Sequence, residues 1–278
     1  MENIFVTLLL FGILICSKLC TAETKNLVFL NFPEKVENSG KLGKQIIKKS
    51  SNTRIFFHYL NATGQDQTFY FRAEGKIKNY KIGYSVDFEP GFAGSSAIVN
   101  FYNKIAKDTV NPLIKVKVPN RHTISGIAEG FFTTGDYWLC RLGFGDYVDN
   151  IKIIKTTFAP ILINENLNDD EEFIYRLGDE KNQIIAGNYG YDYKFQIKNS
   201  TDKIKTLLCK LNPRGGNIIG VFNINGTVYK TVDIKPKVDH LFYKVILKPN
   251  EYIYLKYIPT GGYSYPVEFK FELIPVKI

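Results

Sequence analysis

Beyond residue 24 the chain mostly alternates apolar and polar side chains with a period of two, which is the pattern of β-strands. Residues 55–60, within RIFFHYLN, are apolar on both faces and predict a central strand, and QTFYFRAEG after the next turn predicts its hairpin partner. The same pattern predicts further strands in the first half, over residues 114–118, 123–132, 137–144 and 151–156.

One segment of the first half has the period of a helix instead. Residues 95–107, SSAIVNFYNKIAK, place apolar side chains on one helix face, and Ser95 or Ser96 can accept a hydrogen bond from the free amides of the first turn. Gly91 and Gly94 lead into this segment, but no lysine or serine follows at the spacing of a phosphate-binding loop. The segment therefore predicts a short helix that packs on a sheet.

The second half predicts strands only. They are expected over residues 191–198, 205–211, 218–224, 227–232, 241–247, 252–258 and 267–273. Turn signals separate them about every ten residues, which is typical of a β-sandwich. Asn225-Gly226 predicts a two-residue hairpin turn, because both residue types tolerate positive φ. The glycines of NPRGG mark another turn and lack the lysine and the helix of a phosphate-binding loop.

The boundary between the two halves is expected at residues 159–171. This segment holds Pro160, several asparagines and an acidic run in an otherwise basic chain, and it predicts a solvated linker. The predicted fold is mainly β, with two β-sandwich-like (Ig-like) domains. They cover residues 24–158 and 172–278, and the first contains one short α-helix near residues 95–107.

The first residues predict export. An apolar run over residues 4–16 is followed by Cys20-Thr21-Ala22, and this order indicates a signal peptide over residues 1–22. The run is shorter than the about 20 residues that a membrane-spanning helix needs. An uncleaved anchor and a buried N-terminal strand stay open as alternatives. We expect a secreted or cell-envelope protein with no transmembrane segment after cleavage.

The charge limits the class of partner, and the cysteine content leaves two readings of the thiols open. The formal net charge is +9, but only six of the 36 basic residues are arginines, whereas nucleic-acid readout favours arginine forks. We therefore expect no nucleic-acid partner, and a basic surface can instead meet anionic wall polymers or membranes. Beyond the leader, Cys140 and Cys209 form either one disulfide or two buried thiols, and both readings stay open.

The order of motifs also carries a resemblance. FPEKVENSGKLG, RIFFHYLNATG, GNYGYDYKFQIKN, NPRGGNIIGVFNINGTVY and PTGGYSYPVEF resemble an exported bacterial family of uncharacterised function, often labelled "copper amine oxidase-like domain" proteins. The similarity spans residues 27–269 and is strongest at PRGG followed by GVF and at GGYSYPV. It implies secretion and a paired β-rich architecture, and it implies no established activity.

Oxidase chemistry does not fit the residues present. A copper amine oxidase needs three histidine ligands and a Thr-x-x-Asn-Tyr motif, but Ile185 stands in the threonine position before Asn188-Tyr189. The chain has three histidines in all, His58, His122 and His240, with no close pair, and Tyr59 stands where the family carries a second histidine. We therefore predict no metal and no cofactor, and we read His58 as a histidine of the core or of a sheet face.

No catalytic constellation is visible either. A nucleophile elbow is absent, and the neighbours Asp239 and His240 would point to opposite faces of a strand. A carboxylate-dependent glycoside hydrolase stays a weaker alternative, because the pairing of its acids is spatial. The available carboxylates are Glu74, Asp87, Glu89, Glu129 and Asp136.

Tyrosines in or beside glycine-rich turns give the expected binding site, since tyrosine rings stack on sugars and on protein partners. The candidate ligand-binding residues are Tyr189, Tyr191, Arg214, Tyr263 and Tyr265. The expected function is a non-catalytic envelope or extracellular module that binds a wall polymer, a glycan or another surface protein. A structural component of a surface assembly is the alternative.

Three Asn-x-Thr sequons begin at Asn61, Asn199 and Asn225. They would accept glycans only in a eukaryotic secretory route. In a chain this rich in asparagine they can arise by chance.

Overall fold

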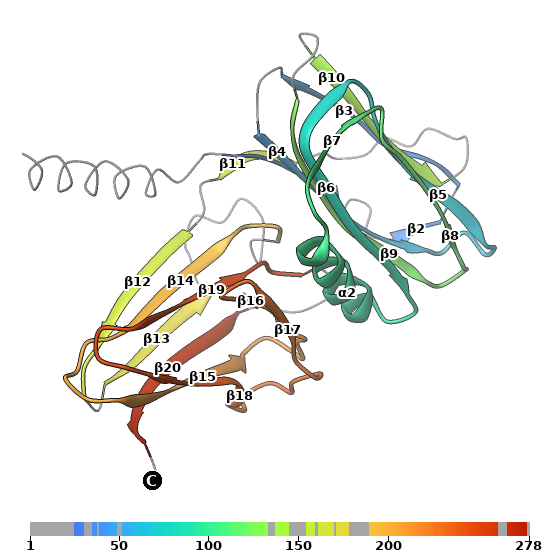
Figure 1. Ribbon diagram of the computed structural model, residues 1–278. Helices are drawn as coiled ribbons and strands as arrows, with labels where there is room; N and C mark the ends of the chain where they lie inside the picture. The colour runs from blue at the N-terminus through green and yellow to red at the C-terminus, as the bar shows by residue number, and fades with distance from the viewer. Residues whose placement is uncertain are drawn as a thin grey trace, which may run out of the picture.

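The computed structural model describes residues 25–30, 35–37, 39–48, 52–132, 137–144, 154–158, 161–169, 171–177, 189–260 and 266–276. These residues are mainly β, as expected, and their four sheets make up two β-rich bodies (Figure 1). The predicted signal peptide over residues 1–22 lies outside the described residues. Within them, no helix is long and apolar enough to cross a membrane.

The first body consists of a seven-stranded and a four-stranded sheet. The larger sheet has the order β11-β1-β4-β9-β6-β7, with β2 also paired to β4, and the smaller has the order β3-β10-β5-β8. The elements are β1 (Lys25–Leu30), β2 (Lys35–Val36), β3 (Gly40–Lys48), β4 (Asn52–Asn61), β5 (Gln67–Ala73), β6 (Lys76–Asp87), α2 (Pro90–Asn103), β7 (Lys107–Val110), β8 (Leu113–Val118), β9 (Thr123–Phe132), β10 (Tyr137–Phe144) and β11 (Ile154–Phe158).

The second body consists of a five-stranded and a four-stranded sheet. Their orders are β12-β14-β19-β16-β17 and β13-β20-β15-β18. The strands are β12 (Ile161–Leu167), β13 (Glu172–Leu177), β14 (Tyr193–Asn199), β15 (Lys205–Pro213), β16 (Val221–Ile224), β17 (Thr227–Lys230), β18 (His240–Leu247), β19 (Tyr252–Tyr257) and β20 (Val267–Pro275).

The two bodies repeat one topology. Apart from β2 and β11, the larger sheets of the two bodies have the same strand order. Across the sheet, the order β1-β4-β9-β6-β7 in the first body corresponds to β12-β14-β19-β16-β17 in the second. The strands β3, β10, β5 and β8 correspond in the same way to β13, β20, β15 and β18. Directions agree as well, because β1 is parallel to β4, β12 is parallel to β14, and the other corresponding pairs are antiparallel.

A buried asparagine side chain forms a hydrogen-bonded corner at the end of β4, and this corner is part of the repeated topology. Asn61 is fully buried, and its Nδ2 donates to the carbonyl oxygens of Gln65 at 3.0 Å and Val118 at 2.9 Å. Its Oδ1 accepts from the backbone N–H of Thr63 at 3.2 Å and from the Thr63 hydroxyl at 2.8 Å. The asparagine therefore joins the end of β4 to the turn after it and to the end of β8.

The same corner recurs at the end of β14. Asn199 is also fully buried, and its Nδ2 donates to the carbonyl oxygens of Lys203 at 2.9 Å and Leu247 at 3.1 Å. Its Oδ1 accepts from the backbone N–H and the hydroxyl of Thr201 at 3.1 and 2.8 Å. Two of the three sequons are thus structural corners with buried asparagines, whereas Asn225 is exposed.

Each body has its own core between its two sheets. Alternate residues of β4, including Ile55, Phe57 and Tyr59, meet Phe69 and Phe71 of β5 in the first core. In the second core, Phe195 of β14 lies 5.0 Å from Phe269 and 5.4 Å from Phe271 of β20, measured between ring centroids. The period-two pattern in the sequence therefore corresponds to rows of side chains that point into the cores.

The helix is present, but it begins five residues earlier than predicted. Pro90 occupies its first turn, Glu89 is the N-cap residue, and neither Ser95 nor Ser96 caps it. Proline suits this place because the amide it lacks would have no partner there. The helix packs closely on β6 at Gly83, where an added Cβ would lie 2.1 Å from the Phe101 nitrogen. A glycine is thus required where α2 crosses the sheet.

Of the other predictions from the sequence, some are confirmed and some are wrong. The Asn225-Gly226 hairpin is confirmed, since both residues have positive φ, 47° and 91°, between β16 and β17. The predicted hairpin of β4 with β5 is wrong, because these strands belong to different sheets. Most of the expected linker is strand β12, which pairs with β14. The second body therefore begins with β12, before the acidic run that was expected to mark the boundary.

Candidate functional site

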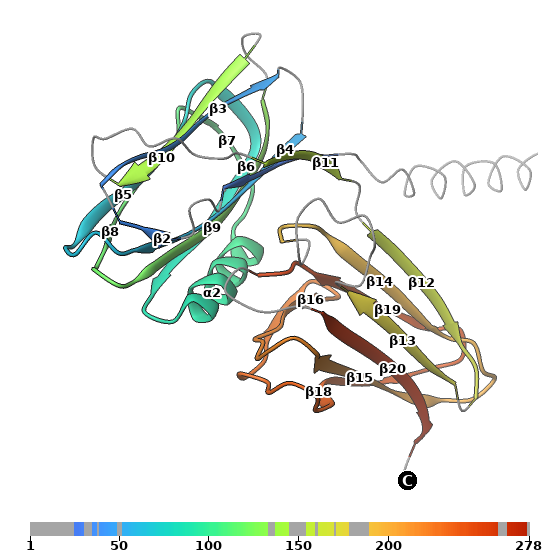
Figure 2. The same ribbon diagram turned by 180° about the vertical axis from the view of Figure 1, so that it is seen from behind.

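The two bodies meet at an apolar junction around α2. In both views the helix lies between the first body and strands β16 and β17 of the second (Figures 1 and 2). Its core joins residues of the first body to residues of the second: Leu27, Phe56, Ile98, Phe101 and Ile127 with Val221 and Ile258. Apolar side chains from both halves of the chain therefore bury one another here.

A buried arginine crosses this junction. Arg54 of β4 is 2% exposed, and its Nε donates to Glu129 Oε2 of the facing strand β9 at 2.8 Å. Its Nη1 donates to Asp192 Oδ1 at 2.8 Å and to the Gly190 carbonyl oxygen at 2.7 Å, both in the second body. Burial alone would lower the pKa of Arg54, but the charges of Asp192 and Glu129 outweigh it and raise that pKa.

Two of the tyrosines predicted as ligand-binding lie at this junction. Tyr189 stacks on Phe56 of the first body with ring centroids 6.2 Å apart and an interplanar angle of 17°. Tyr191 packs against both the second core and the junction core. Their rings are half-buried, and they join the two bodies. Tyr263 and Tyr265 lie outside the described residues.

Arg214 lies in a charged cluster on β13, β15 and β20. Its Nη2 donates to Glu268 Oε1 at 3.0 Å, and Arg176 Nε donates to Glu268 Oε2 at 2.9 Å. Glu268 is only 1% exposed. Its burial would raise the pKa of this carboxyl, but Arg176 and Arg214 outweigh that cost and hold the pKa below its usual value. Arg214 thus pairs with a buried carboxylate of its own chain.

The disulfide reading of the cysteine pair is wrong. Cys209 is a free thiol and is fully buried in the second core. Burial raises the pKa of this thiol well above its ordinary value, so it packs as a small apolar group. Cys140 lies on β10 of the first body, in a different sheet, and its side chain is not among those described.

The other candidate chemistry is spread over the molecule. Within the described residues, no three His, Cys, Asp or Glu side chains gather as a metal site would require. Of the carboxylates considered for hydrolysis, Glu129 is engaged by Arg54, and Asp87 accepts from the backbone N–H of Glu89 at 3.1 Å. Asp136 lies outside the described residues. The structure thus brings none of these acids together around a shared cleft that it describes.

His58 is a buried histidine on β4, as the sequence indicated, 1% exposed and opposite Ser125 of β9. Burial lowers its pKa to about 4 from 6.5, so the ring is neutral at pH 7. The unfolded chain binds the proton more tightly, and stability must therefore fall as the pH drops below 6.5.

We expect His58 alone to remove about 2 kcal/mol of unfolding free energy between pH 7 and pH 5. His58→Gln should lose this part of the pH dependence, as measured by urea unfolding at both pH values. His122→Gln is the control, because His122 lies in the turn before β9 and is only half-buried. Equal pH dependence in wild type and His58→Gln would contradict the assignment.

The open face of the second body carries a different set of tyrosines. On β19, Ile253 and Leu255 point into the second core, so Tyr252, Tyr254 and Lys256 point outward. The two tyrosines are 44% and 47% exposed, and their ring centroids lie 4.9 Å apart at 69°. They form an edge-to-face aromatic pair on the outside of the sheet, which we call the aromatic platform.

The neighbouring strands surround this platform with lysines and amides. On β14, Lys198 lies opposite Tyr252, Gln196 opposite Tyr254, and Lys194 opposite Lys256. On β12, Asn164 and Asn166 follow in register, and both are exposed. We call this set the tyrosine face: Asn164, Asn166, Lys194, Gln196, Lys198, Tyr252, Tyr254 and Lys256.

Among the described residues of the second body, no helix corresponds to α2. In the first body α2 connects β6 to β7 and covers the outer side of their sheet. The corresponding strands β16 and β17 are joined only by Asn225-Gly226. The helix α2 therefore covers the outer side of the five-stranded sheet near the junction, where Val221 and Val228 pack.

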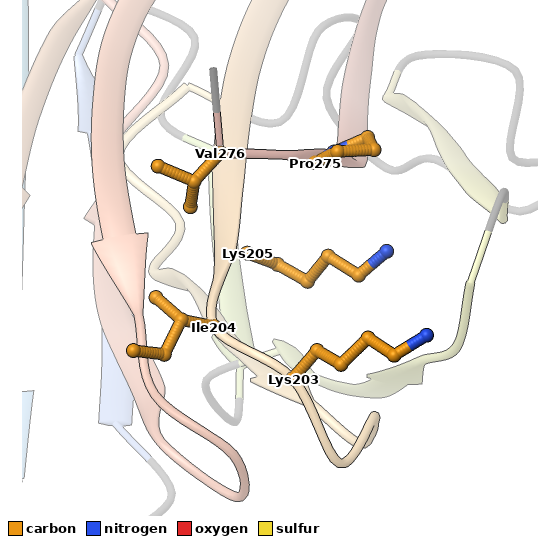
Figure 3. Close-up of a pocket in the computed structure, with 5 residues that line it drawn as sticks. All are labelled: Lys203, Ile204, Lys205, Pro275 and Val276. Atoms are coloured by element: carbon orange, nitrogen blue, oxygen red, sulfur yellow. The ribbon is translucent and has the colours of Figure 1, made fainter. Parts of the chain in front are cut away.

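A pocket of about 430 Å³ lies elsewhere on the second body, where β15 begins and β20 ends. Figure 3 shows Lys203 and Lys205 extending to one side of the chain and Ile204 to the other, with Pro275 and Val276 completing the lining. Lys205 is buried and its ammonium pairs with Asp169. Because that charge is neutralised within the chain, the pocket offers mainly apolar surface.

No protein-family model matches the chain, and no curated protein matches it either. What the tyrosine face binds has to follow from its own side chains. Sequence reasoning placed a strand over these residues but considered only tyrosines near glycine-rich turns. The signal was the alternation Tyr-Ile-Tyr-Leu-Lys over residues 252–256, since a strand with one buried face exposes every second residue.

Proposed function

We propose that the protein is an exported, non-catalytic envelope or extracellular module that binds a polysaccharide through the tyrosine face. The supporting observation is the exposed pair Tyr252 and Tyr254, fixed on a rigid sheet and bordered by amide side chains. Tyrosine rings offer an apolar surface for the C–H faces of sugar rings, and the hydroxyl stays in water.

The strand positions favour an extended ligand. Residues two apart on β19 are separated by about 6.6 Å, and adjacent strands by about 4.8 Å, so the described side chains of the face form an extended two-dimensional array. Asn164 and Gln196 supply donors and acceptors for sugar hydroxyls across the grid. A chain of several sugars can contact more of such a surface than a single sugar can.

The repeated topology supports a module with a scaffold role. We also propose that both bodies are variants of one Ig-like sandwich, since each packs two mainly antiparallel sheets around one core. A structural component of a surface assembly is the second candidate, and the junction that joins the two bodies through Arg54 favours it.

The test is binding of the full chain to a panel of neutral and acidic polysaccharides, measured by affinity electrophoresis. Tyr252→Ala/Tyr254→Ala should weaken binding by about tenfold or more, because buried aromatic contacts dominate such interfaces. Phe88→Ala is the control, since Phe88 is a 58% exposed ring on the first body. Unchanged binding by the double tyrosine variant would refute the proposed site, and no binding by wild type to any polysaccharide would refute the function.

A further inference from the structure

The charge on the tyrosine face is one-sided. Its outward positions on β14 and β19 include three lysines, and the outward positions described on β12, β14 and β19 include no carboxylate. The acid next to it in sequence, Glu251, accepts from the backbone N–H of Lys248 at 2.8 Å. The platform therefore lies in a positive field, and the net charge of +9 strengthens it.

Two of these lysines lie at opposite ends of the tyrosine pair. Lys198 is directly opposite Tyr252, about 5 Å away between Cβ atoms by strand geometry. Lys256 lies two residues beyond Tyr254 on the same strand and is exposed. A ligand that contacts both rings therefore brings its flanking groups to a lysine on either side.

We propose, building on the proposed function, that the ligand is an acidic polysaccharide whose pyranose rings carry carboxylates, as in a polyuronate. Two requirements meet in this polymer. The tyrosines need rings to stack on, and the lysines need anionic groups attached to those rings. Neutral glucans supply the rings without the charge, and glycerol-phosphate polymers supply the charge without the rings.

The lysines act as point charges here, which suits a carboxylate that can approach from several directions. Their contribution is electrostatic and exposed, so salt must weaken it over the range in which the Debye length falls below about 10 Å. The stacking contribution of Tyr252 and Tyr254 is apolar and far less sensitive to salt. Binding should therefore have a salt-dependent part that belongs to the lysines and a salt-resistant part that belongs to the tyrosines.

The experiment measures binding of the full chain to polygalacturonate, to a neutral glucan of matched length and to poly(glycerol phosphate), at low and high salt. Polygalacturonate should bind tightest, by about tenfold over either alternative at low salt. Lys198→Gln/Lys256→Gln should weaken polygalacturonate binding by about fivefold to tenfold and flatten its dependence on salt. Tyr252→Ala/Tyr254→Ala should weaken it at both salt concentrations.

Lys115→Gln/Lys244→Gln is the matched control, because it removes the same two charges from exposed strand positions outside the tyrosine face. If it weakens binding as much as the Lys198 and Lys256 pair, net charge alone explains the affinity and the inference is wrong. Equal affinity for the neutral glucan, with sensitivity to the tyrosine variant, would keep the proposed function and overturn the acidic ligand. Tightest binding to poly(glycerol phosphate) would overturn it too, and failure of all three polymers to bind would overturn both.

Discussion

Replacing Arg54 with methionine is expected to lower the free energy of unfolding by about 3–5 kcal/mol, the usual cost of removing one partner from a buried ion pair. Glu129 and Asp192 are only 15% and 14% exposed, so both carboxylates would keep their desolvation cost and lose the guanidinium of Arg54. The Gly190 carbonyl oxygen would lose its donor as well. The cost is large because one side chain satisfies groups from both bodies.

Chemical unfolding followed by tryptophan and tyrosine fluorescence measures this change. Arg72→Met is the control, since Arg72 is half-exposed and 3.8 Å from Glu74, and it should cost less than about 1 kcal/mol. The triple variant Arg54→Met/Glu129→Gln/Asp192→Asn should recover much of the loss, because it removes the charges of both carboxylates together with the guanidinium. If Arg54→Met costs no more than Arg72→Met, the junction does not depend on the arginine.

The junction should also loosen in the single variant. Asp192 and Gly190 are the second-body partners of Arg54, and apolar packing around Phe101 and Val221 would remain. Limited proteolysis of the chain between the bodies should therefore become faster in Arg54→Met than in wild type. Unchanged cleavage together with lowered stability would place the whole effect inside the first body, on Glu129.

The strands were predictable from the sequence where the signal is local. Residues 123–132 and 137–144 are rich in apolar, β-branched and aromatic side chains and form strands as predicted, and Asn225-Gly226 carries its own turn chemistry. Partner strands were not predictable in the same way, because β4 and β5 are joined by a short turn yet belong to opposite sheets. That choice depends on core packing between the sheets, which adjacent residues do not encode.

The misread segment shows a second limit. Residues 161–167 looked like a linker because asparagines and an acid dominate them, although Ile161, Ile163 and Leu167 keep the strand period. The polar residues there, Asn164 and Asn166, occupy exposed positions of an edge strand. Composition outweighed periodicity in the prediction, and periodicity was the better guide.

The candidate site was only partly within reach of the sequence. Tyrosines beside glycine-rich turns were plausible binding groups, but Tyr189 and Tyr191 are half-buried at a junction that no local pattern announces. Arg54 and Asp192 are 138 residues apart, and nothing near either of them indicates the other. To predict that Tyr252 and Tyr254 are exposed, one must know which face of β19 is covered. That depends on where α2 lies.

The buried asparagine corners predict the other large loss of stability. Asn199→Ala removes an acceptor from the Thr201 N–H and hydroxyl and a donor from the carbonyl oxygens of Lys203 and Leu247. Each buried group left without a partner costs about 1–3 kcal/mol, so the variant should lose roughly 3 kcal/mol or more. Asn61→Ala should behave alike, because its corner makes the corresponding bonds.

Calorimetry together with hydrogen exchange can separate the two corners. Asn199→Ala should reduce amide protection first in β14, β15 and β18, and Asn61→Ala in β4, β5 and β8, since each asparagine ties those strands together. Asn199→Asp isolates the donor role, because it keeps the acceptor and sets a second oxygen against the two carbonyls, so it should be no better than alanine. Asn166→Ala, at an exposed position of the edge strand β12, is the control and should cost about 1 kcal/mol or less. Losses at Asn61 and Asn199 no larger than that would show that the corners are incidental, and a loss of protection shared equally by both bodies would show that they unfold as one unit.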